Sequence, residues 1–144
     1  MGITEDGAEA LRAHGLRVTE PRLAVLRAFH PGQHLEAKAI LALVAAELPR
    51  TSLQAVYGVL TALTDAGVLR RIEPAGSAAL YERRVGDNHH HVVCRECRSV
   101  EDIDCVVGAV PCLEPETTAG FQIESAEVTF WGLCPRCAAV PALA

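Results

Sequence analysis

The stretch TSLQAVYGVLTALTDAGVLRRIEPAGSAALYE, residues 51–82, changes from a helical to an extended pattern and decides how the first half of the chain folds. The pair Thr51-Ser52 supplies plausible helix caps, and apolar residues then recur at the spacing of one helix face. Strands are predicted over 68–72 and 78–81, around the turn Pro74-Ala75-Gly76. The stretch therefore predicts a helix followed by a β-hairpin.

Three further helices are predicted before this stretch, over residues 4–14, 19–29 and 36–48. Gly15 fits the end of the first helix, Thr19 can cap the second, and Pro49 follows the third. Short helices followed by a hairpin are the order of a winged helix-turn-helix. We therefore expect residues 1–82 to form a winged-helix DNA-binding domain.

The helix after Ser52 is the candidate recognition helix, because helix-turn-helix proteins place the N-terminal half of their second helix in the major groove of DNA. The half expected to face DNA runs from Ser52 to Tyr57, and Ser52 is a candidate DNA contact. Gln54 can read a base edge, and Tyr57 can pack on a thymine methyl or reach a phosphate. Arg17 and Arg22 are candidates for phosphate contacts. The alternative is an amphipathic helix of another small domain, with both arginines as solvated surface groups.

The second half of the chain carries two Cys-x-x-Cys motifs, Cys94-Arg95-Glu96-Cys97 and Cys134-Pro135-Arg136-Cys137. Each motif aims two sulfurs at one ion, and two motifs supply the four thiolates of a closed structural Zn(II) site. Residues 98–133 leave room for a small sheet between the motifs. The alternatives are a redox Cys-x-x-Cys pair or four small buried side chains.

Histidines 89–91 precede the first motif and suggest a second, exchangeable metal site. Alternate side chains of a strand share a face, so His89 and His91 are expected to point the same way and His90 the other. Together with His34, Glu82 and Asp102, the side chains of His89 and His91 could hold one ion, which would bridge the two halves of the chain. The alternative is a polar surface loop with three ordinary histidines.

The remaining composition bounds the class of protein. Residues 1–83 carry nine basic and nine acidic side chains, so the net charge of −5 arises entirely from residues 84–144, and DNA can approach the N-terminal half. We expect no membrane span and no signal peptide, and six cysteines without export signals favour metal ligation in the cytoplasm.

Residues 83–88 are polar and are predicted to form a hinge, followed by a metal-binding dimerisation domain over 89–144. Strands are predicted over 91–94, 99–104 and 122–131. Prolines and glycines disfavour a long helix over 107–120. The fold class is thus α+β, with an N-terminal winged helix-turn-helix domain and a small C-terminal α/β dimerisation domain that holds the four-cysteine zinc site.

The chain resembles the ferric uptake regulator (Fur) family over nearly its whole length, and within it the actinobacterial FurA/CatR-type peroxide-responsive repressors. The motifs that carry the resemblance are Leu16–Arg22, Gln54–Tyr57, His89–Cys94 and Trp131–Cys137. It implies a homodimeric repressor that binds a double-stranded DNA operator. It also implies structural Zn(II) at Cys94, Cys97, Cys134 and Cys137, and a regulatory ion at His34, Glu82, His89, His91 and Asp102. The regulatory ion would be Fe(II) or Mn(II), with Zn(II) able to bind in vitro.

Three departures from the family pattern are expected to matter. Gly58 stands where an arginine often follows the tyrosine of the recognition helix. A further metal site of some members falls on Asn88, His90 and Ala126, and we do not expect it here. The long helix of the dimerisation domain is replaced by the stretch after Cys105.

Asp102 bears on what is sensed, because peroxide-sensing members resemble this chain in having aspartate there. In them Fe(II) reacts with peroxide and oxidises a ligand histidine, which by position would be His34 or His89. Cys105 and Cys112 add the possibility of a redox disulfide, whereas the alternative is two buried small side chains.

Three hypotheses follow. The first is a repressor that responds to peroxide and controls oxidative-stress genes such as a catalase-peroxidase. The second is an iron or zinc uptake regulator that responds to metal availability only. The third is a thiol-disulfide enzyme. Since no catalytic grouping or phosphate loop is found in the sequence, we expect a non-enzyme.

Overall fold

A computed structural model describes residues 3–83, 85, 87, 89–105 and 113–139. The chain divides into two compact units, Met1–Val85 and Gly86–Ala144. The proposed hinge at 83–88 stays a prediction, because positions 84, 86 and 88 lie outside the described residues.

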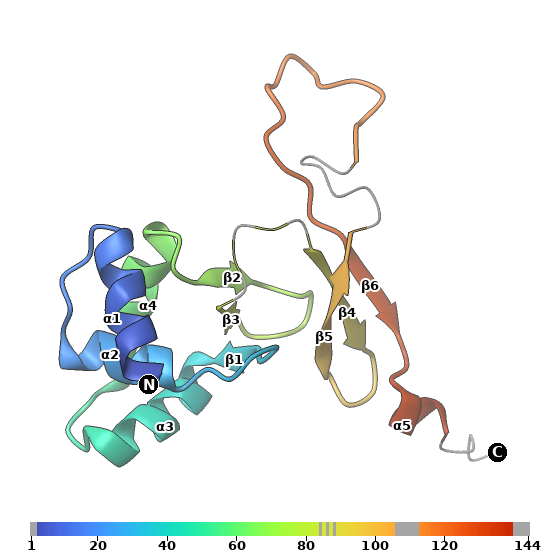
Figure 1. The fold of residues 1–144 in the computed structure, drawn as a ribbon. Coiled ribbons are helices and arrows are strands. Elements are labelled where there is room, and N and C mark those ends of the chain that lie inside the picture. The colour runs from blue at the N-terminus through green and yellow to red at the C-terminus, as the bar shows by residue number, and fades with distance from the viewer. Residues whose placement is uncertain (1–2, 84, 86, 88, 106–112, 140–144) are drawn as a thin grey trace. The chain divides into compact units, whose positions relative to one another are not determined.

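The first unit contains the helices α1 (Ile3–Ala13), α2 (Glu20–Arg27), α3 (Ala37–Glu47) and α4 (Leu53–Asp65), as Figure 1 shows. The predicted caps are in place: Thr19 accepts a hydrogen bond from the Arg22 N–H, and Ser52 accepts one from the Ala55 N–H. Gly67, with φ of +81°, follows the end of α4 in the left-handed region that favours glycine. The four predicted helices are therefore confirmed, with ends shifted by one or two residues.

The core of this unit is aliphatic. Its largest fully buried side chains belong to Leu11, Leu26, Ile40, Leu60, Leu63 and Leu69. They come from all four helices and from the segment that leads into the sheet. Outside the core, Arg27 donates two hydrogen bonds to Glu47 Oε2, at 3.1 and 2.6 Å, and links α2 to α3.

A three-stranded sheet completes the first unit. It contains β1 (Leu35–Glu36), β2 (Arg70–Ile72) and β3 (Leu80–Glu82) in the antiparallel order β1-β3-β2. The turn between β2 and β3 closes with a hydrogen bond from the Ser77 N–H to the Pro74 carbonyl, so the predicted hairpin is confirmed. Sequence analysis missed β1, because a strand of two residues shows no alternation.

The second unit is a sheet in the order β5-β4-β6, followed by a short helix (Figure 1). Its elements are β4 (His89–Cys94), β5 (Val100–Asp104), β6 (Thr129–Gly132) and α5 (Pro135–Ala138). β4 pairs antiparallel with β5 and parallel with β6. The register places His91 between Asp102 and Thr129.

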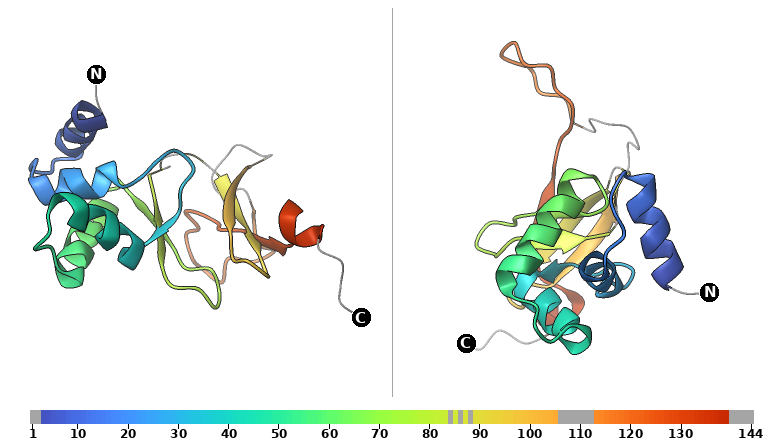
Figure 2. Two further views of the ribbon diagram at one scale, coloured as in Figure 1. Left: turned by 90° about the horizontal axis from the view of Figure 1, so that it is seen from below. Right: turned by 90° about the vertical axis from the view of Figure 1, so that its left-hand side faces the viewer.

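The predicted strand over 122–131 is wrong for residues 122–128, which have no regular structure. β6 begins opposite His91, and β4 itself begins only two residues earlier, so most of the preceding segment has no strand to pair with. Figure 2 shows this segment extending away from the sheet. Residues 113–120 of the stretch 107–120 also form no helix, as expected, whereas 107–112 lie outside the described residues.

Every helix in the described part of the chain is too short or too polar to cross a lipid bilayer.

Candidate metal centres and DNA-reading helix

The four cysteines of the two motifs converge in the second unit. The four Sγ atoms all lie within 4.8 Å of one another, and Cys97 Sγ is 3.7 Å from Cys134 Sγ. Sulfurs bound to one tetrahedral Zn(II) at about 2.3 Å lie about 3.8 Å apart. None of the four forms a disulfide. The donor set and its spacing therefore fit a structural zinc ion.

The first motif is a hairpin loop between β4 and β5, and the second opens α5. The loop closes through hydrogen bonds from the Arg98 N–H to the Cys94 carbonyl and from the Cys94 N–H to the Ser99 carbonyl. Arg98 has φ of +65°, which is uncommon for a residue with a side chain. In the second motif Cys134 is the N-cap of α5 and Pro135 occupies its first turn.

The thiols of this cluster differ in pKa because the protein supplies hydrogen bonds unevenly. Hydrogen bonds from the backbone N–H groups of Cys134 and Cys97 lower the pKa of Cys94 to about 6. The Ser99 hydroxyl and N–H lower the pKa of Cys97. Hydrogen bonds with the thiols of Cys134 and Cys94 raise the pKa of Cys137 to about 12. Four thiolates this close need a cation to ionise together, which is the charge that Zn(II) supplies.

Two arginines accompany the cluster. The guanidinium carbons of Arg95 and Arg98 each lie 5.6 Å from the ring centroid of Trp131, the only tryptophan of the chain. Both distances are within the range of a cation–π contact.

A second group of donors lies on the face of the same sheet that carries His89 and His91. The ring centroids of His89 and His91 are 4.9 Å apart, which confirms the prediction that the two side chains share a face of the strand. His89 Nε2 lies 3.5 Å and His91 Nε2 lies 3.3 Å from the same atom, Asp102 Oδ1. Neighbouring donors on an octahedral ion at about 2.1 Å are about 3.0 Å apart, so these three atoms need only small shifts to bind one metal.

Asp87, which the sequence analysis missed, adds a second carboxylate to this group. Its Oδ1 accepts a hydrogen bond from His89 Nδ1 at 2.5 Å. A donated Nδ1–H fixes the imidazole tautomer that leaves Nε2 available to a metal. The signal in the sequence is an acidic residue two positions before the first histidine, but such residues are also common in surface turns.

In the first unit His34 and Glu82 lie side by side, because β1 pairs with β3 in the register Leu35 to Tyr81. His34 Nε2 is 2.8 Å from Glu82 Oε2, and both side chains are buried. Arg70 Nε, another group not found from the sequence, lies 3.9 Å from Glu82 Oε1. One carboxylate oxygen thus faces an imidazole and the other faces a guanidinium.

The proposed DNA-contacting residues belong to the first unit as well. Gln54, Tyr57 and Gly58 are exposed on α4, with Tyr57 at 47% of its full exposure. Ser52 is exposed, and its hydroxyl is used to cap α4. Arg22 donates a hydrogen bond from Nη1 to the Arg17 carbonyl at 2.8 Å, which holds the two arginines together at the start of α2.

Of the two cysteines considered for a redox disulfide, Cys112 lies outside the described residues. The disulfide therefore stays a prediction.

Comparison with known proteins decides the family. The model of the family described as "Ferric uptake regulator family" matches residues 13–131, which is most of the chain. The chain belongs to the ferric uptake regulator family. As a member of that family it is a metal-dependent transcriptional regulator, and the prediction that it is not an enzyme is confirmed.

Among this Fur-family protein's relatives is the transcriptional regulator FurA of Mycobacterium tuberculosis, 53% identical over 137 residues that cover 95% of this chain and 93% of that protein. The ferric uptake regulation protein 2 of Mycolicibacterium fortuitum is 48% identical and covers 98% of this chain and 99% of its own. The predicted resemblance to actinobacterial FurA is thus confirmed.

The crystal structure of the ferric uptake regulator of Vibrio cholerae superposes with a TM-score of 0.64 at 25% identity, covering 88% of this chain and 98% of that one. Together with the helices and sheets described above, this likeness confirms the predicted α+β fold class with a C-terminal cluster of four cysteines.

Proposed function

We propose that this protein is a repressor whose binding to operator DNA depends on one regulatory metal ion held by His34, Glu82, His89, His91 and Asp102. The observation that carries the proposal is the convergence of two imidazole nitrogens on one carboxylate oxygen in the second unit, at 3.3 and 3.5 Å. Two histidines and one carboxylate are a donor set typical of Fe(II), and Mn(II) accepts the same nitrogen and oxygen donors.

The pair formed by His34 and Glu82 in the first unit supports the same proposal, since it offers one further nitrogen and a carboxylate. If both sets bind one ion, the ion joins the two units of the chain. Metal loading would then change the freedom of the first unit, and with it the affinity for DNA. The four-cysteine cluster would hold Zn(II) permanently, because four thiolates leave no open coordination position.

Helix α4 is the proposed reading element. Gln54 and Tyr57 are exposed near its start, and the capping bond of Ser52 fixes where the helix begins. Arg22 lies in the first turn of α2 and Arg17 lies just before the helix, and both are proposed to contact phosphates. The similar Vibrio cholerae regulator is described as having DNA-binding domains, which supports a double-stranded DNA partner.

The second unit is proposed to form a homodimer. On the face of the sheet opposite His91, Phe130 pairs with Val92 and Ile103 pairs with His90, and Ile103 and Phe130 are 36% and 47% exposed. Apolar side chains grouped on a sheet face mark an interaction surface. An Ile103→Glu or Phe130→Glu variant should be monomeric by light scattering, and a variant that stays dimeric would refute this surface.

The dependence on metal is tested with a duplex selected from a random library by the Mn(II)-loaded protein. Wild-type affinity for this duplex should fall at least about tenfold when Mn(II) is removed, whereas an H89A/H91A variant should bind weakly with or without Mn(II). The matched control is His14→Ala, which removes an exposed histidine of the first unit. An H89A/H91A variant that still responds to Mn(II) would refute the proposed site.

We further propose that the sensed signal is peroxide and that the controlled genes serve oxidative stress, such as a catalase-peroxidase. Support comes from Asp102 at the carboxylate position, where the peroxide-sensing members that this chain resembles also have aspartate. Bound Fe(II) would activate hydrogen peroxide by giving it one electron, and the ligand histidine would be the net two-electron reductant, keeping one peroxide oxygen while the other leaves as water. The alternative is an iron or zinc uptake regulator that responds to metal availability only.

Exposure of the Fe(II)-loaded protein to peroxide separates the two. Peptide mass spectrometry should find one added oxygen on His34 or His89, together with loss of duplex binding. The Mn(II)-loaded protein, treated in the same way, should remain unmodified. Intact histidines and unchanged DNA binding in the Fe(II) form would eliminate peroxide sensing and leave the uptake regulator.

A further inference from the structure

The first unit contains a surface pocket of about 480 Å³ that the regulatory function above does not use. Its walls come from α2, from the end of α3 with the following turn, and from α4. The lining residues are Pro21, Val25, Val44, Leu48, Pro49, Arg50, Thr51, Ala55, Val56 and Val59. The volume lies within the range of about 300–1,000 Å³ that is typical of small-molecule sites.

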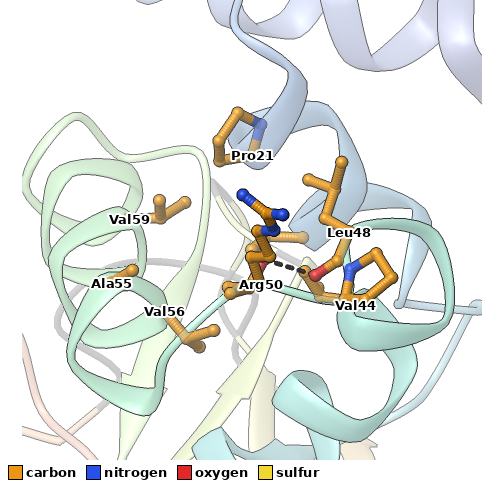
Figure 3. A pocket seen from close by; sticks show the side chains of 10 residues that line it. Pro21, Val44, Leu48, Arg50, Ala55, Val56 and Val59 are labelled. Carbon is orange, nitrogen blue, oxygen red and sulfur yellow. Dashed lines mark hydrogen bonds between the residues drawn. The ribbon is translucent and has the colours of Figure 1, made fainter.

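The pocket is apolar apart from the charged group of Arg50 and the hydroxyl of Thr51, which donates a hydrogen bond to the Leu48 carbonyl. Figure 3 shows Val59, Ala55 and Val56 on one wall and Leu48 and Val44 on the other, with the Arg50 guanidinium between them, on the side of Pro21. No carboxylate lines the pocket. Arg50 is exposed and forms no hydrogen bond or ion pair within the described part of the chain.

A nearby arginine of the same unit shows the contrast. Arg27, on α2, is neutralised by Glu47 through three hydrogen bonds. Arg50 lacks such a partner among the described residues and stands at an apolar pocket that is wide enough for a small organic molecule. A charge in this position selects a ligand that has one anionic end and an apolar body.

From this we infer that the pocket is a binding site for a small amphiphilic carboxylate, such as a medium-chain fatty acid. The acyl chain lies against Leu48, Ala55 and Val59, which are the more exposed apolar residues of the walls, and the carboxylate accepts hydrogen bonds from Arg50. The site goes beyond the regulatory function, because it needs neither the metal ion nor DNA.

One consequence rests on the proposed function. Pro21 and Ala55 line the pocket next to Arg22 and Gln54, two residues proposed to contact DNA. A carboxylate bound to Arg50 would place negative charge beside the path of the phosphates. The bound acid should therefore weaken duplex binding.

The test is isothermal titration of the zinc-loaded full chain with decanoate and, separately, with the neutral decanol, without DNA. Decanoate should saturate one site per chain. Arg50→Gln should weaken decanoate at least about tenfold and leave decanol unchanged, because it removes only the charged partner. Lys38→Gln, which removes an exposed cation elsewhere on α3, is the matched control and should bind decanoate as the wild type does.

Val59→Phe fills the pocket and should abolish binding of both compounds. If this variant loses its cooperative thermal transition, Ala55→Phe, on an exposed position of the same wall, replaces it. The inference is overturned by an absence of saturable decanoate binding at millimolar concentration, or by binding that survives the filling variants. It is also overturned if Lys38→Gln weakens decanoate as much as Arg50→Gln does.

Two further outcomes concern DNA. If decanoate fails to bind while Arg50→Gln weakens the duplex, Arg50 is a phosphate contact and the pocket has no ligand. If decanoate binds through Arg50 but leaves duplex affinity unchanged, the competition is refuted and the binding site stands. Because the titration contains no DNA, failure of the site and failure of the proposed regulatory function are distinguishable.

Discussion

Replacing Asp87 tests whether the imidazole of His89 is held in place for a metal. Asp87 Oδ1 accepts the hydrogen bond of His89 Nδ1, and His89 Nε2 faces Asp102. Loss of such an outer partner typically lowers metal affinity by about 10–100-fold, or about 1.4–2.7 kcal/mol. The Asp87 side chain is 43% exposed, and solvent screening places the expected loss at the lower limit, about tenfold.

The assay is a competition titration of Mn(II) against a fluorescent chelator, with zinc retained at the four-cysteine cluster. Asp87→Ala should bind Mn(II) about tenfold more weakly than the wild type. Asp87→Asn keeps an acceptor oxygen but loses the charge, so its effect should be smaller. The zinc content and the thermal transition should not change in either variant.

Glu101→Gln is the matched control, because Glu101 is an exposed carboxylate of β5 that pairs with Val92 on the opposite face of the sheet. It should bind Mn(II) as the wild type does. Wild-type affinity in Asp87→Ala, or an equal loss in Glu101→Gln, would show that general charge rather than orientation of His89 matters.

The remaining predictions concern stability, DNA binding and thiol chemistry. Gly58 lies inside α4 with no atom within 4 Å of an added Cβ, so Gly58→Ala should stabilise the protein by about 0.5–1 kcal/mol in thermal unfolding; no gain would contradict this. Gly58→Arg adds a cation to the reading face and should tighten duplex binding with a steeper salt dependence, which a salt titration checks. Arg27→Ala removes the partly exposed ion pair with Glu47 and should lower the free energy of unfolding, measured with denaturant, by about 0.5–1 kcal/mol. An unchanged free energy of unfolding would show that solvent fully screens the pair. In zinc-free protein the lowered pKa of Cys94 favours the folded state above the ordinary thiol value, and this contribution is lost as pH falls from about 9 toward about 6. Alkylation of Cys94 should accordingly have its midpoint near pH 6, whereas Cys137 should stay protonated until about pH 12; a common midpoint would contradict the unequal hydrogen bonding.

The sequence was informative wherever one short segment contains its own physical cause. The caps Thr19 and Ser52 begin their helices because each side chain bonds an N–H three residues later. It failed over residues 122–128 of the strand predicted for 122–131, because no partner strand extends far enough to pair with them. Sequence analysis also missed Asp87, because an acidic residue in a turn does not indicate which side chain it will contact.

By itself, the sequence determined the helices of the first unit, the hairpin and the two cysteine motifs, because helix periodicity, capping and a two-residue cysteine spacing are local properties of the chain. Only the tertiary structure decided which distant groups meet. The pairing of β1 with β3 places His34 against Glu82, and the register of β4 on β5 brings Asp102 to both imidazoles. A shift of one residue in either register would turn those side chains to the opposite face, so long-range strand pairing fixes the candidate site.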